Sequence, residues 1–261
     1  MKEKGTRNKT ISIAVAGKGG SGKTSVASLV IRYLVRRNMG NVLAVDADPN
    51  SNLAEGLGLE VHQTVGRILN EFQGEKLNIP AGMTKESYLD YRLNMAFTES
   101  HGLDLVTMGR GEGPECYCYP NVIIRKLVDE WAQNYAYVVI DNEAGMEHLS
   151  RRTTQDVNEL LLVSDYSVKG LRAIVRVRDL VRELQLRVGR EWVIVNKVPG
   201  EINPLLAGEM ERLGLEPALI IPQDSELERF DLEQQPLLDL SDDSTAVIAV
   251  TSFLDKLLKS N

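Results

Sequence analysis

A glycine-rich segment near the start of the chain constrains the fold more than any other stretch. It reads G-K-G-G-S-G-K-T at residues 17–24, and it lies between the apolar run 11–16 and the glycine- and proline-free run 26–31. A strand, a glycine loop and a helix in this order are the context in which G-x-x-x-x-G-K-[ST] binds phosphate. Glycines let successive backbone N–H groups turn toward an anion, and the positive end of the following helix points to the same place. The sequence therefore predicts a phosphate-binding loop, with an ordinary glycine-rich turn as the alternative.

Two side chains of this loop have specific predicted roles. Lys23 is expected to reach the β- and γ-phosphates of a nucleotide, and the Thr24 hydroxyl is expected to ligate Mg²⁺. The predicted nucleotide-binding residues of this stretch are Gly17, Lys18, Gly19, Gly20, Ser21, Gly22, Lys23, Thr24 and Ser25.

Short aliphatic runs alternate with helical stretches along the rest of the chain. Strands are predicted at 11–16, 42–45, 103–108, 137–141, 160–163, 192–195 and 219–221, and the long helices at 168–186 and 245–258. Continuously aliphatic strands that alternate with helices predict an α/β fold, in which a mostly parallel sheet has helices on both faces. Residues 1–9 are expected to form a flexible polar tail, and residues 10–261 a single domain.

Charge and composition limit the partners that we expect. The formal net charge of −7 argues against a general binder of nucleic acid or of anionic membranes, because both favour a basic face. No apolar run approaches the length of a membrane span, and the first residues lack the core of a signal peptide. Two cysteines cannot build a disulfide framework. We therefore expect a cytoplasmic protein that binds neither nucleic acid nor membrane.

Carboxylates that follow predicted strands are the next candidate site residues, because ligands of such sheets bind at the carboxyl ends of the strands. Asp141 ends one aliphatic run and is expected to hold Mg²⁺, while residues 142–145 could move with the γ-phosphate. Asp46 and Asp48 end another run, so one could hold Mg²⁺ or its water and the other could orient the attacking water. The structural alternative for all three is a cap of a turn or helix. The predicted magnesium ligands are Thr24, Asp46 and Asp141.

The pair Lys18 and Lys23 resembles the deviant phosphate loop of the MinD/ParA class of ATPases, which includes the nitrogenase iron protein. The resemblance implies that Lys18 reaches across a two-fold axis to the nucleotide of a partner subunit, so that ATP closes a homodimer. Residues 46–49 and 141–145 resemble the two switch segments of the class. The resemblance thereby implies hydrolysis of ATP, with Lys18, Lys23, Asp48 and Asp141 as catalytic residues.

Two shorter matches extend the resemblance toward the nucleotide base. Asn196 follows a predicted strand and resembles the base-reading asparagine of the class, and residues 221–224, with Pro222, resemble the loop that closes over adenine. An amide side chain can pair with a purine edge through one donor and one acceptor.

Cys116 and Cys118 form a Cys-x-Cys pair after the third predicted strand, 103–108. Two residues one apart on extended backbone point the same way. Two thiolates suit a soft or borderline metal ion but leave a four-coordinate site half filled, and a two-fold axis would supply the other two. The alternatives are two free thiols or a reducible pair.

With residues 141–152 downstream, this cysteine pair resembles the CooC-type nickel-insertion ATPases, which serve carbon monoxide dehydrogenase and have close relatives that serve acetyl-CoA synthase. The resemblance implies a homodimeric metallochaperone that holds Ni²⁺, or Zn²⁺ at the same cysteines, and couples ATP hydrolysis to loading of that client enzyme. Two alternatives stay open. One is an iron–sulfur reductase component related to the nitrogenase iron protein, and the other is a MinD/ParA-like positioning ATPase.

Overall fold

One eight-stranded sheet organises the protein. The computed structural model describes residues 10–50, 52–74, 79–109, 130–142 and 156–259. The strand order is β3-β4-β2-β5-β1-β6-β7-β8, and all neighbours are parallel except the antiparallel pair β3 and β4. The strands are β1 (Ile11–Gly17), β2 (Val42–Asp46), β3 (Phe97–Ser100), β4 (Leu103–Thr107), β5 (Tyr137–Asp141), β6 (Asp156–Ser164), β7 (Arg187–Val198) and β8 (Pro217–Pro222).

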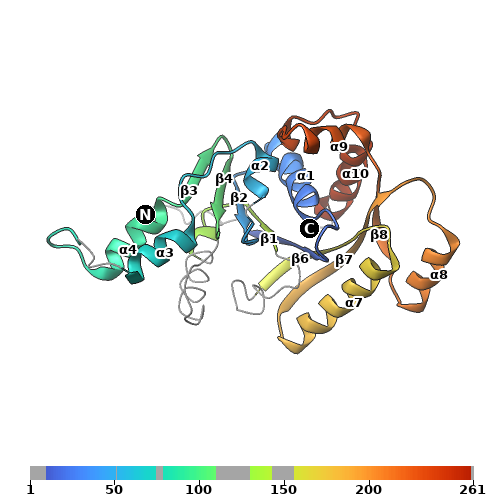
Figure 1. Cartoon of the computed structure of the whole chain (residues 1–261), viewed down its shortest axis with the longest axis horizontal. Coiled ribbons are helices and arrows are strands. Elements are labelled where there is room, and N and C mark those ends of the chain that lie inside the picture. The colour runs from blue at the N-terminus through green and yellow to red at the C-terminus, as the bar shows by residue number, and fades with distance from the viewer. Residues whose placement is uncertain (1–9, 51, 75–78, 110–129, 143–155, 260–261) are drawn as a thin grey trace, which may run out of the picture.

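Helices cover both faces of the sheet, which gives three layers (Figure 1). The core on one face includes residues of α1, α2, α9 and α10, and the core on the other includes residues of α3, α4, α7 and α8. The helices are α1 (Lys23–Arg36), α2 (Leu53–Leu57), α3 (Val65–Gly74), α4 (Lys85–Asn94), α7 (Val168–Glu183), α8 (Pro204–Arg212), α9 (Ser225–Leu232) and α10 (Thr245–Lys259), with the 3₁₀ helix η1 (Leu237–Asp239) before α10.

The strand β2 shows why continuous aliphatic runs form this architecture. Its side chains alternate between the faces, so Leu43 and Val45 pack in one core while Val42 and Ala44 pack in the other. The predicted α/β fold with a mostly parallel sheet is therefore confirmed. The apolar stripe of the last helix also packs on the sheet, since its buried residues are Ala246, Val247, Val250, Phe253, Leu254 and Leu257.

The sequence-based prediction was incomplete at one edge of the sheet and in the last third of the chain. All seven predicted strands are present, six of them with shifted ends, but β3 was not predicted because it is only four residues long and half of it is exposed. The short helices α8 and α9 were also missed. The sequence also predicts a helix from about residue 121 to residue 133, and this segment lies largely outside the described residues.

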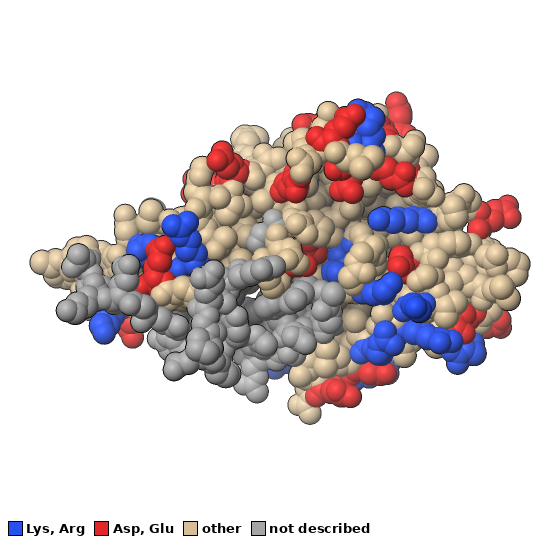
Figure 2. Space-filling view, in the orientation of Figure 1, with Lys and Arg blue, Asp and Glu red and all other residues tan. Residues whose placement is uncertain are grey.

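Charged side chains are distributed unevenly over the face shown in Figure 2, where acidic groups gather near α9 and α10 and basic groups gather over α7. Several α7 arginines pair with carboxylates: Arg172 with Glu209 at 2.9 Å and Arg178 with Glu191 at 3.0 Å.

Among the described residues, no helix combines the length and apolarity needed to cross a membrane.

Register brings the predicted site residues to one edge of the sheet. Asp46 of β2 lies opposite Thr107 of β4 on one side and opposite Asp141 of β5 on the other. Asp141 in turn lies opposite Val15 of β1, two residues before the glycine loop begins. The carboxyl ends of the central strands and the loop therefore meet at one place, as the rule for parallel sheets predicts.

Candidate functional site

The glycine loop connects β1 to α1 in the predicted way. Gly22 has a φ of 86° and immediately precedes the first turn of α1, whose ladder opens with the bond from the Val26 N–H to the Gly22 carbonyl at 3.0 Å. A β-carbon on Gly22 would lie 2.3 Å from Asn196 Nδ2, and one on Gly17 would lie 2.1 Å from the carbonyl oxygen of Val163. Glycine is required at both positions because the backbone passes this close to its neighbours.

Thr24 and Asp141 lie in direct contact at the base of the loop. The Thr24 hydroxyl donates to Asp141 Oδ2 over 2.6 Å, while Lys23 Nζ folds back and donates to the Lys18 carbonyl over 3.4 Å. Burial raises the pKa of Asp141 to about 6, against the opposing effects of the Thr24 hydroxyl and the Lys23 charge. The structure thus joins two of the three predicted magnesium ligands.

Asp46, the third predicted ligand, is fully buried and bonds to its own loop. Its Oδ1 accepts from the Asp48 N–H at 3.1 Å, and its Oδ2 accepts from the Leu53 N–H at 3.0 Å. Burial raises its pKa to about 7, although the Leu53 N–H acts in the opposite direction. Asp48 instead lines the cleft beside the loop, and its carboxylate accepts from the Asn50 N–H at 2.8 Å. Asp46 and Asp48 would share a face if strand geometry continued to Asp48, but β2 ends at Asp46.

The side chain of Asn196 contacts the glycine loop. Its Nδ2 donates to the Ser21 carbonyl over 2.9 Å, and its Oδ1 accepts from the Lys197 N–H at 2.9 Å. Lys197 has a φ of 59°, so the chain turns sharply here inside β7. Both polar atoms of Asn196 are thus bonded within the protein, and its predicted contact with a base stays a prediction.

The segment that resembles an adenine loop is anchored by Asp224. Pro222 ends β8 beside Val198. The Asp224 carboxylate caps α9 by accepting from the Glu226 and Leu227 N–H groups, and it also accepts from Ser244, Thr245 and Ala246 at the start of α10. Burial alone would raise the pKa of Asp224, but these hydrogen bonds together hold it below its ordinary range.

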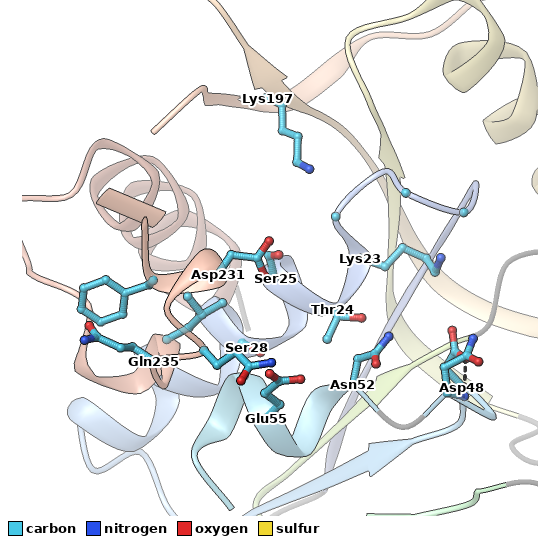
Figure 3. A pocket seen from close by; sticks show the side chains of 18 residues that line it. Lys23, Thr24, Ser25, Ser28, Asp48, Asn52, Glu55, Lys197, Asp231 and Gln235 are labelled. Atoms are coloured by element: carbon cyan, nitrogen blue, oxygen red, sulfur yellow. Dashed lines mark hydrogen bonds between the residues drawn. The ribbon is translucent and has the colours of Figure 1, made fainter. Parts of the chain in front are cut away.

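A cleft of about 600 Å³ opens beside the loop (Figure 3). The predicted residues that line it are Gly19, Gly20, Gly22, Lys23, Thr24, Ser25 and Asp48. Figure 3 shows Lys197 across the cleft from Asp231 of α9, with Glu55 of α2 and Gln235 also in the lining. Sequence reasoning missed these four residues as a group, because they come from β7, α9, α2 and the loop after α9 and form no local motif.

Lys18 makes an ion pair that sequence reasoning also missed. Its Nζ lies 3.2 Å from Oδ2 of Asp165, which directly follows β6. Ligands of parallel sheets bind at the carboxyl ends of the strands, and Asp165 lies at the carboxyl end of β6. The same rule therefore identifies Asp165 as a candidate site residue.

The loop and its surroundings fit a magnesium–nucleotide. Among the described residues, Ser21 Oγ and Asp141 Oδ1 are buried and lack a hydrogen-bond partner. Buried polar atoms without partners cost free energy, and a ligand with its metal ion can supply the partners. The glycine backbone, the Lys23 ammonium and the paired Thr24 and Asp141 are the donor set that a nucleotide phosphate with Mg²⁺ requires.

Two sets of predictions fall on parts of the chain that are not described. Cys116, Cys118 and most of the second predicted switch, residues 143–145, lie outside the described residues. Within the part that is described, no group of three or more His, Cys, Asp and Glu residues is arranged to hold a metal ion. The predicted cysteine metal site therefore stays a prediction.

Known proteins similar to this chain include both characterised and uncharacterised relatives. The protein is 41% identical over 248 residues to the uncharacterised ATP-binding protein MJ0685 of Methanocaldococcus jannaschii, an alignment that covers 94% of this chain and 98% of that one. It is 28% identical to the carbon monoxide dehydrogenase accessory protein CooC of Rhodospirillum rubrum, over 88% of this chain and 90% of that one.

Solved structures and a family model agree with the fold. The septum site-determining protein MinD of Pyrococcus horikoshii, complexed with Mg-ADP, superposes with a TM-score of 0.71 at 20% identity and covers 97% of each chain. Residues 12–237 match the model of the CobQ/CobB/MinD/ParA nucleotide-binding domain. The protein therefore belongs to the CobQ/CobB/MinD/ParA family of nucleotide-binding P-loop proteins.

Proposed function

We propose that the protein is an ATP-hydrolysing metallochaperone that dimerises around ATP and a metal ion held by Cys116 and Cys118. Its client would be a nickel enzyme such as carbon monoxide dehydrogenase or acetyl-CoA synthase. The observation that carries the proposal is the similarity to CooC, a carbon monoxide dehydrogenase accessory protein, along 88% of the chain. The ATP-binding relative at 41% identity supports ATP as the nucleotide.

The proposed ATP site uses the side chains already assembled at the loop. Lys23 Nζ, 3.4 Å from the Lys18 carbonyl, leaves that weak bond for the phosphates, and Ser25 also lines the cleft. Thr24 and Asp141 would hold Mg²⁺, and Asp46 would hold one of its waters or fix the loop that carries Asp48. When bound, Mg²⁺ neutralises charge on the β- and γ-phosphates. Asp48, which lines the cleft, orients the attacking water in this proposal.

The proposed metal site requires two copies of the chain. Two thiolates fill half of a tetrahedral or square-planar site, and a two-fold axis brings a second Cys116 and Cys118. Nickel is the cargo that the CooC similarity suggests, and the same thiolates also suit Zn²⁺. Lys18 would connect the two sites, because closing the dimer around ATP also brings the cysteine pairs together.

Metal titration combined with mass measurement tests this proposal. We would titrate Ni²⁺ and Zn²⁺ anaerobically into the nucleotide-free and ATP-bound protein and follow molecular mass by light scattering. One metal ion per two chains is expected, with loss of binding in Cys116→Ala and Cys118→Ala but not in Tyr117→Phe. One metal ion per chain in a persistent monomer would contradict the shared site.

The same preparations separate the rival functions. A brown protein that contains iron and sulfide would support the reductase component. A protein that dimerises with ATP and supports its client equally well without the two cysteines would support a positioning ATPase of the MinD/ParA type instead.

A further inference from the structure

Lys18 and Asp165 form an ion pair within one chain, although Lys18 is proposed to contact the nucleotide of a second chain. The ammonium Nζ and Asp165 Oδ2 are 3.2 Å apart, and the two side chains are 40% and 26% exposed. The parallel register that places Gly17 opposite Val163 brings the start of the loop beside the end of β6. The contact is therefore a direct consequence of the sheet topology.

Asp165 is held in the orientation that meets Lys18. Its Oδ1 accepts from the Ser167 hydroxyl at 2.5 Å, and Ser167 itself caps α7 by accepting from the Gly170 N–H at 3.0 Å. A β-carbon on Gly170 would lie 2.1 Å from Asp165 Oδ1, so any larger residue there would displace the carboxylate. The Asp165 carbonyl also accepts from the Ser164 hydroxyl at 2.7 Å. One carboxylate oxygen is thus fixed to the helix cap, and the other meets the lysine.

The backbone of Lys18 is anchored within the loop. Its carbonyl accepts from the Ser21 N–H at 3.2 Å and from Lys23 Nζ at 3.4 Å. Rotation of the long Lys18 side chain can therefore carry the ammonium away from Asp165 without disturbing the loop, because the four-carbon stem absorbs the movement.

We propose that Asp165 is the resting counter-ion of Lys18, which holds the ammonium on its own subunit until the nucleotide of a second copy draws it away. Asp165 is then a positioning residue that acts through Lys18. This inference rests on the ATP-dependent dimer of the proposed function. A partly exposed ion pair stabilises little, so a nucleotide polyphosphate can compete for the lysine once two chains approach.

Removal of the Asp165 charge tests the proposal through the dimer. Asp165→Asn keeps the shape of the side chain but weakens its hold on Lys18. Because a closed dimer releases two such pairs, its dissociation constant with a non-hydrolysable ATP analogue should fall about 2- to 30-fold. The matched control is Asp179→Asn, which loses an exposed pair with Arg182 at 3.6 Å on α7, away from the loop, and should leave the constant unchanged. Sedimentation measures both, and unchanged or weaker dimerisation of Asp165→Asn would overturn the proposal.

A second measurement uses the nucleotide-free monomer and does not depend on dimerisation. An amine-reactive reagent should label Lys18 faster in Asp165→Asn than in the unaltered protein, with the exposed Lys85 as internal reference in mass spectrometry. Equal labelling rates would show that Asp165 does not hold Lys18. A protein that stays monomeric with ATP while Lys18 labelling rises would refute the proposed dimer but keep the ion pair, so the two failures are distinguishable.

Discussion

Replacement of Asn196 separates two possible roles of its side chain, support of the glycine loop and recognition of a base. Asn196 is only 6% exposed, and its amide bonds to the Ser21 carbonyl and to the Lys197 N–H, each over 2.9 Å. Both bonds are made to backbone groups of the protein, one in the glycine loop and one in β7. We therefore expect Asn196→Ala to weaken every ligand that carries the phosphates, whatever base is attached.

The size of this effect follows from the bond to Ser21. Alanine leaves the carbonyl of this fully buried residue without its side-chain donor. A buried polar group without a partner costs about 1–3 kcal/mol. At about 1.4 kcal/mol per tenfold change, the dissociation constants of ATP and of inorganic tripolyphosphate should both rise about 5- to 150-fold. The Lys197 N–H adds little, because that residue is exposed and its N–H can bond to water.

Calorimetric titration with ATP, GTP and tripolyphosphate, each with Mg²⁺, decides between the roles. The control is Asn203→Ala, which removes the cap of α8 at the Leu205 N–H but no contact with the loop, and should leave all three constants unchanged. If Asn196→Ala kept its affinity for tripolyphosphate and lost only the discrimination between ATP and GTP, the side chain would read the base and our reasoning would be refuted.

Two further substitutions test the supports of the site. Asp224→Asn should lower the free energy of unfolding at pH 7 by about 3 kcal/mol. Because the native pKa of Asp224 is depressed, this loss of stability should become smaller as the pH falls below about 4. Urea unfolding at several pH values measures it, and Asp243→Asn, at an exposed position, is the control variant. Gly17→Ala should lower the free energy of unfolding by about 1–3 kcal/mol, because the new methyl group meets the Val163 carbonyl. Gly208 lies in open space within α8, so Gly208→Ala should raise the free energy of unfolding by up to about 1 kcal/mol. Equal thermal shifts for the two alanine variants would contradict the argument from the close approach.

The sequence contained enough information to predict the architecture and the centre of the site. Aliphatic strands such as β2 and β5 are buried on both faces, so their runs of apolar residues are unambiguous. Strand ends of a parallel sheet converge, so the position of Asp141 at the end of an aliphatic run predicts that it lies near the glycine loop. The contact of Asp141 with Thr24 at 2.6 Å agrees with that prediction.

Partners of polar side chains were much harder to predict than their positions. Asp46, Asn196 and Asp224 all lie where ligand contacts were expected, yet each bonds to backbone groups of neighbouring turns. A sequence states that a carboxylate or amide is present, but whether it meets a ligand or its own backbone depends on turn geometry. The residues Glu55, Asp231 and Gln235 were missed for a related reason, since tertiary packing alone brings them into the cleft.

Hydrogen bonds between strand ends join the candidate magnesium ligands to the strand that precedes the cysteine-containing segment of the sequence. The Ala47 N–H donates to the Asp141 carbonyl at 2.9 Å, and the Met108 N–H donates to the Asp46 carbonyl at 2.9 Å. Backbone hydrogen bonds therefore join the ends of β5, β2 and β4 to one another. Gly109 follows, and the chain then enters the segment 110–129 that contains both cysteines. In the proposed function, we therefore expect the affinity of the cysteine pair for metal to depend on the bound nucleotide.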